Sequence, residues 1–160
     1  MKKLIAIITF ALAITINAFA QDGKAIYNKY SDEKGVSAVY ISPAMFRMIG
    51  RIPELNIGED EINITPIIKS LNGFYLINIE NSAVASSLRN DVNKLIGGNK
   101  FELMLEAKDD GETIRIYTVG DKKTITAFVM TAYEGNSCTF ISMEGAIDRD
   151  AFEKMLASQM

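Results

Sequence analysis

The C-terminal part of this sequence constrains the fold most, because its apolar residues alternate with polar ones. From Phe101 to Lys108 the odd-numbered residues are apolar and most even-numbered residues are charged. Successive side chains of a strand point to opposite faces, so this period predicts a half-buried strand over 101–108. Asp110-Gly111 follows, and this pair favours a type I′ hairpin turn because that turn needs positive φ at both central positions.

Three more strands are predicted after this turn, over residues 113–119, 124–133 and 138–145. The short turn sequences Gly120-Asp121 and Gly135-Asn136 separate them. Because short connections join antiparallel neighbours, the four strands are predicted to form a meander.

Capping residues and prolines predict the elements of the N-terminal half. Ser42-Pro43 places a capping hydroxyl before a proline at the first helical position, which predicts a helix from Pro43 to Ile49 closed by Gly50. The other predicted elements are a helix starting at Asp22 and ending before Gly35, strands over 36–41 and 74–80, a loop over 50–64, a brief helix from Thr65-Pro66 to Asn72-Gly73, a helix from Asn81 or Ser82 to Gly97-Gly98, and a helix beginning at Asp148.

Together these elements predict an α+β fold, a two-layer sandwich. Its mostly antiparallel sheet would contain the C-terminal four-stranded meander plus one or two N-terminal strands, with helices packed on one face. No repeat or linker divides the chain after residue 20, so residues 21–160 are predicted to form a single α+β domain.

The first twenty residues have the pattern of a cleavable signal peptide. Lys2-Lys3 is positive, 4–16 is almost continuously apolar, and Ala18-Phe19-Ala20 is a small-x-small cleavage site. The apolar run is short for a bilayer span, and a short uncleaved anchor is the alternative. We therefore expect cleavage near Ala20 and a periplasmic or extracellular protein, with no membrane span in the mature chain.

Composition excludes several kinds of chemistry. The chain has no His and one Cys, so a His base, a His metal ligand, an internal disulfide and a cysteine zinc site are all excluded. Removing the signal peptide would leave 15 basic against 20 acidic side chains, a poor match for nucleic acid. The single thiol, Cys138, lies in an apolar run and is predicted to be buried.

Carboxylates are the remaining source of acid-base or metal chemistry. One loop contains Glu54, Glu59, Asp60 and Glu61, whose oxygens could hold calcium, although a charged loop is usually solvated. Two carboxylates also suffice for a glycosidase. No spacing singles out a pair, so the sequence assigns no catalytic, metal-binding or cofactor-binding residue, and no cofactor is expected.

The segment 43–52 is methionine-rich and apolar on nearly all sides of its predicted helix. One interpretation is a surface that binds another protein, for which methionine's adaptability is suited. The alternative is a core helix whose arginine stems run along the surface. The predicted partner surface consists of Met45, Phe46, Arg47, Met48 and Arg51.

The segments VSAVYISPAMFRMI at 36–49 and ITAFVM at 125–130, together with the signal sequence, resemble a family of small exported Bacteroidetes proteins, domain-of-unknown-function family 4252. The resemblance implies an envelope location and a single α+β domain. It supplies no catalytic residue. Some relatives are encoded near sigma and anti-sigma factors, which implies an accessory role in envelope signalling.

Three functional hypotheses follow from the sequence. The first is a non-catalytic periplasmic binding or accessory protein that recognises another envelope protein. The second is a protein that binds a small apolar or lipidic molecule between helices and sheet. The third is a carboxylate-dependent hydrolase. The oligomeric state is left open.

Overall fold

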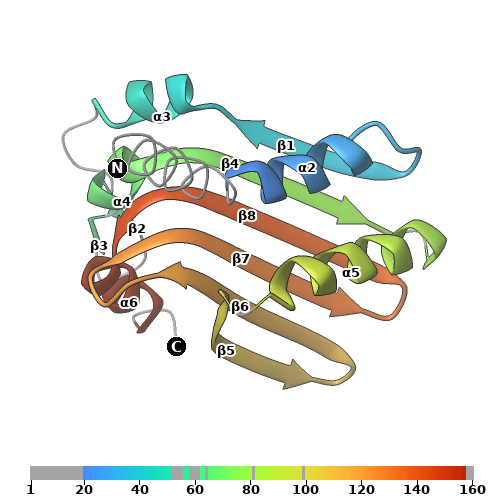
Figure 1. Ribbon diagram of the computed structural model, residues 1–160. Helices are drawn as coiled ribbons and strands as arrows, with labels where there is room; N and C mark the ends of the chain where they lie inside the picture. The colour runs from blue at the N-terminus through green and yellow to red at the C-terminus, as the bar shows by residue number, and fades with distance from the viewer. Residues whose placement is uncertain are drawn as a thin grey trace, which may run out of the picture.

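A computed structural model describes residues 20–51, 56–57, 62–63, 65–80, 82–98 and 100–157. At its centre is a six-stranded sheet in the order β1-β4-β8-β7-β6-β5, and every neighbouring pair is antiparallel (Figure 1). The predicted α+β sandwich is therefore confirmed. The strands are β1 (Val36–Ile41), β4 (Leu71–Ile79), β5 (Glu102–Asp109), β6 (Glu112–Gly120), β7 (Thr124–Glu134) and β8 (Ser137–Asp148).

Within the described ranges, five helices accompany this sheet. They are α2 (Ala20–Tyr30), α3 (Pro43–Ile49), α4 (Thr65–Ser70), α5 (Ser82–Ile96) and α6 (Arg149–Ala157). A separate short pair, β2 (Asn56–Ile57) and β3 (Ile62–Asn63), lies within the predicted loop. Most of that loop, its four acidic residues and the predicted signal peptide before Ala20 lie outside the described residues.

Several local predictions are confirmed by backbone geometry. Asp110 and Gly111 both have positive φ, 37° and 90°, as the hairpin turn between β5 and β6 requires. The Ser42 hydroxyl accepts a hydrogen bond from the Met45 N–H at 3.3 Å and so caps α3. Asp148 accepts one from the Ala151 N–H at 2.8 Å and caps α6 in the same way.

The predicted meander is confirmed as β5 to β8, and β1 and β4 extend it beyond β8. Helix α5 carries the chain from β4 across the sheet to β5 at the far edge (Figure 1). This crossover makes β1 and β5 the two outer strands. Helix α4 ends at Ser70 rather than at Asn72-Gly73, because the chain already pairs as a strand from the buried Leu71.

Apolar side chains occupy both faces of the sheet. Val129 packs in one core and Phe128, the preceding residue on β7, packs in the other. Because successive strand residues point to opposite faces, the two cores lie on opposite sides. The first core contains Ile26, Tyr30, Ile77, Ile79, Ala85, Leu88, Val92, Val129, Tyr133, Cys138 and Phe140. The second contains Phe46, Ile67, Leu71, Ile116, Ile125, Phe128, Ile147 and Phe152.

The two long helices, α2 and α5, cover the first core as a layer on one face (Figure 1). The short helices α3, α4 and α6 gather at the end of the sheet where β1 and β8 end, and each contributes one buried residue to the second core. The two long helices thus form the helix layer of the sandwich on one face, and the three short helices pack on the other. Cys138 is buried in the first core as predicted, and burial raises the pKa of its thiol to about 11.

The prediction that the odd-numbered residues of β5 form its buried face is wrong in part. Leu103 is 50% exposed, whereas Met104, predicted to point outward, packs against the second core. The register of β5 against β6 shifts between Leu103 and Leu105. An irregularity of this kind inserts an unpaired residue, which reverses the alternation that the sequence displays.

Candidate functional site

Helix α3 lies at the surface and is anchored through one aromatic side chain. Phe46 is only 3% exposed and packs in the second core, so its assignment to the partner surface is wrong. The reason is its position four residues after the Ser42 cap, on the side of α3 that meets the sheet and the preceding Ile41. By contrast Met45 is 45% exposed and Met48 is 58% exposed.

Arg47 and Arg51, the other predicted members of the surface, are also exposed. The segment from Val36 to Arg51 contains these two basic residues and no acidic one. The exposed side of α3 is therefore apolar and positively charged at once. The alternative, a core helix whose arginine stems run along the surface, applies to Phe46, which is in the core, and not to the exposed Met45 and Met48.

Strand β1 adds two exposed apolar residues that the sequence analysis did not single out. Val39 is 46% exposed and Tyr40 is 45% exposed. Of the five large apolar side chains exposed in the described part of the chain, four lie in β1 and α3. We call Val39, Tyr40, Met45 and Met48 the β1-α3 surface. An outer position in the sheet is a tertiary property, so no local signal marks Val39 and Tyr40.

Tyr40 is held in place although it is exposed. Its ring stacks on that of Tyr75 in β4, with centroids 5.2 Å apart and planes 12° apart. Tyr27 of α2 packs against both rings, at centroid distances of 6.0 Å and 5.7 Å. Aromatic pairs at these separations stabilise their geometry, so β1 presents Tyr40 in a fixed orientation.

The two edges of the sheet differ in how they are protected. β5 contains Glu102, Glu106, Lys108 and Asp109 and has the register shift, all of which discourage pairing with another strand. β1, with the sequence VSAVYI, has no charge, proline or register irregularity, and within the described residues it pairs with β4 alone. Its outer backbone N–H and C=O groups are therefore suited to pair with a further strand.

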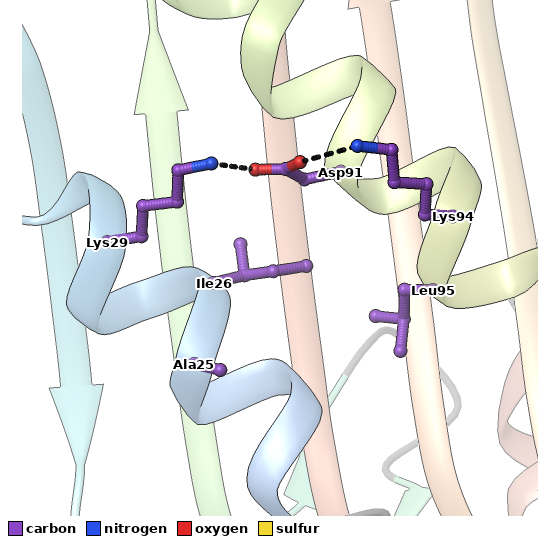
Figure 2. A pocket seen from close by; sticks show the side chains of 6 residues that line it. All are labelled: Ala25, Ile26, Lys29, Asp91, Lys94 and Leu95. Atoms are coloured by element: carbon purple, nitrogen blue, oxygen red, sulfur yellow. Dashed lines mark hydrogen bonds and ion pairs between the residues drawn. The ribbon is translucent and has the colours of Figure 1, made fainter.

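A second feature is a pocket of about 410 Å³ between α2 and α5 (Figure 2). Ala25, Ile26 and Leu95 form its apolar wall. Figure 2 shows Lys29 of α2 and Lys94 of α5 on either side of Asp91, at N–O distances of 2.5 Å and 3.7 Å.

Asp91 binds the two helices together rather than leaving a charge for a ligand. The Tyr30 hydroxyl donates a hydrogen bond to its Oδ2 at 2.7 Å, beside the one from Lys29. These hydrogen bonds lower the pKa of Asp91 below its ordinary value. The polar groups of this pocket thus pair with one another, and their hydrogen bonds and ion pairs link α2 to α5.

A smaller hollow of about 200 Å³ is lined by three carboxylates. Glu80, Glu112 and Glu134 line it, and Glu112 and Glu134 are directly opposed on β6 and β7. Glu80 and Glu134 are exposed to solvent. Two of the three carboxylates are therefore solvated rather than packed against an apolar wall of the kind that raises the pKa of a catalytic acid.

In the described part of the chain, no three His, Cys, Asp or Glu side chains come together in a way that could hold a metal ion. The helices seen in those same ranges are all too short or too polar to cross a bilayer.

Comparison with known proteins gives one match. Residues 30–155 match the family described as a domain of unknown function, DUF4252. The chain belongs to this family. Among curated proteins and among solved structures nothing matches the chain. The DUF4252 region begins at Tyr30, the last residue of α2, and includes the whole six-stranded sheet and the β1-α3 surface.

Proposed function

We propose that this DUF4252 protein is an exported, non-catalytic recognition protein that binds an envelope partner through the β1-α3 surface. The observation that carries the proposal is the unprotected edge of β1, flanked by exposed methionines, on a sheet whose other edge is charged. The N-terminal sequence with its small-x-small site supports export.

The chemistry of the surface suggests the form of the partner. The outer backbone of β1 would pair with an extended segment, and this β-augmentation supplies main-chain hydrogen bonds. Met45 and Met48 offer adaptable apolar contacts beside it. Arg47 and Arg51, with no acidic residue between Val36 and Arg51, favour a partner segment that carries Asp or Glu side chains.

Matched substitutions on the two edges test the proposal. Val39→Lys and Leu103→Lys each place a charge at a half-exposed apolar position, one on β1 and one on β5. Full-length tagged chains would be produced in the native host and purified with whatever co-purifies. We expect Val39→Lys to remove a partner that both wild type and Leu103→Lys retain, with similar melting temperatures for the two variants.

Hydrogen exchange on the complex provides an independent measurement. Bound partner should slow exchange of the outward amides of β1 and leave those of β5 unchanged. If Leu103→Lys loses the partner equally, or if β1 amides exchange at the same rate in the complex, the proposal is wrong.

A second copy of the chain is the competing occupant. Light scattering of purified wild-type protein distinguishes it, because pairing of two β1 edges would give a dimer that Val39→Lys dissociates. That result would overturn recognition of a separate envelope protein.

A further inference from the structure

A polar pocket of about 370 Å³ lies on the α5 side of the sheet, away from the β1-α3 surface. Its walls come from α5, β6, β7 and the two hairpin turns. The lining residues are Arg89, Asn93, Gly111, Thr113, Arg115, Tyr133 and Gly135. Thr113 and Tyr133 are directly opposed on β6 and β7, so one rigid part of the sheet forms the floor.

Buried donors in this pocket lack partners. Tyr133 is 8% exposed, and its buried hydroxyl makes no hydrogen bond within the described structure. The buried Nε of Arg89 is likewise without an acceptor there. The Thr131 hydroxyl, which is also buried, lies near the Tyr133 phenol but outside hydrogen-bond geometry, and its proximity lowers the pKa of Tyr133 against the larger effect of burial. Because most buried polar groups in proteins are satisfied, two unpaired donors that line one pocket point to an acceptor from outside the chain.

The charge of the pocket is positive. Arg89 stacks on the Tyr133 ring, with its Cζ 4.3 Å from the ring centroid, and no carboxylate of the described residues is within ion-pair distance of it. Arg115 donates a hydrogen bond from its Nε to Glu106 at 2.6 Å. This contact does not involve the two terminal nitrogens of Arg115, which can therefore donate to a ligand. The Tyr133 hydroxyl is protonated at neutral pH because the ordinary pKa of a phenol is about 10, and burial raises this pKa further.

We propose that this pocket binds a phosphate group, with Arg89, Arg115 and Tyr133 as its donors. The three donors come from three different elements, α5, β6 and β7. A tetrahedral oxyanion accepts hydrogen bonds from several directions, and Arg is suited to phosphate because its planar fork donates in pairs. The Glu80, Glu112 and Glu134 carboxylates are not among its lining residues, because they line a separate hollow.

Titration with inorganic phosphate tests the site, with acetate as the planar comparison. Calorimetry gives affinity, and the Arg89 Nε–H resonance in NMR spectra reports whether phosphate reaches this side chain. We expect saturable phosphate binding that shifts this resonance. Arg89→Gln and Tyr133→Phe should each weaken binding about tenfold or more, the loss of at least one charge-assisted hydrogen bond.

Two controls separate binding from folding. Tyr133→Phe retains the ring beneath Arg89 and removes only an unpaired hydroxyl, so its melting temperature without phosphate should equal or exceed that of wild type. Arg47→Gln removes an exposed arginine of α3 and should bind phosphate as wild type does.

A vesicle co-sedimentation experiment distinguishes a lipid phosphate from a free one. Vesicles containing phosphatidic acid that co-sediment with wild type but not with Arg89→Gln would assign a lipid headgroup, and binding of inorganic phosphate alone would assign a free anion. The proposal fails if wild type binds no phosphate, if acetate binds with the same dependence on Arg89 and Tyr133, or if Arg47→Gln weakens binding as much as Arg89→Gln.

Discussion

The phenol of Tyr30 donates a 2.7 Å hydrogen bond to Asp91, 61 positions later in the chain. Tyr30 is the last residue of α2, and Asp91 lies within α5. Both helices pack on the first core. The Asp91 carboxylate, which also pairs with Lys29 of α2, therefore links α2 to α5 beside the apolar contacts of Ile26 and Tyr30.

Acid should weaken the hydrogen bonds that Asp91 accepts from Lys29 and Tyr30. The hydrogen bonds from Lys29 and Tyr30 lower the pKa of Asp91 in the folded state. A group with a lowered folded pKa stabilises the fold above its unfolded pKa, about 3.9 for Asp, and loses that contribution as pH falls through the folded value. We expect the unfolding free energy of Asp91→Asn to lie below that of wild type at neutral pH and to converge with it below about pH 4.

Urea unfolding of both proteins between neutral pH and pH 3 measures this convergence. Tyr30→Phe removes one of the two main donors and should give an intermediate curve. Parallel curves for wild type and Asp91→Asn across the acid range would contradict the role given to this carboxylate.

Two neighbouring residues of α3 should differ sharply in stability effect. Phe46→Ala removes a buried ring from the second core and should lower the unfolding free energy by about 3 kcal/mol or more. Met48→Ala changes a side chain that is 58% exposed and should stay within about 0.5 kcal/mol of wild type. Chemical denaturation of each variant checks this, and equal effects would show that α3 is not oriented as described.

Gly145 should not tolerate a side chain. A Cβ there would overlap the backbone carbonyl of Ser70, where β8 passes the start of β4. Because backbone cannot move aside as a flexible side chain can, we expect Gly145→Ala to cost about 2 kcal/mol or more. Gly98→Ala is the matched control, since its nearest neighbour would be the Leu95 carbonyl at 3.9 Å, and thermal unfolding should show little change for it.

The cap of α6 should contribute to stability through one hydrogen bond. Asp148→Ala removes the acceptor of the Ala151 N–H and should cost about 1 kcal/mol. Asp148→Ser restores a capping oxygen and should recover most of the loss. If the Ser and Ala variants melt together, the side chain at this position does not act as a cap.

The features that could be predicted from the sequence are those that depend only on residues close together in the chain. The caps at Ser42 and Asp148 and the Asp110-Gly111 turn each act within one turn of chain. The four-stranded meander was predictable for the same reason, because its hairpins are short. The inward face of β5 was not, since the register shift at Leu103 arises from pairing with β6.

The candidate sites show the same division. Met45 and Met48 were predictable as unusual residues, but that Phe46 is buried between them depends on how α3 meets the sheet. The pocket at Arg89 combines residues of α5 with a strand that follows more than 20 positions later and another more than 40 positions later. No spacing in the sequence relates them.

The sequence by itself determined the kinds and order of the elements other than the β2-β3 pair, because caps, turns and periodicity act over a few residues. It also determined the absence of His-based and disulfide chemistry, which follows from composition alone. The tertiary structure decided which strand became an exposed edge, which side of α3 was covered, and that Arg89 lies over Tyr133. Those outcomes depend on packing between segments distant in the chain, and on the α5 crossover that places β5 at the edge opposite β1.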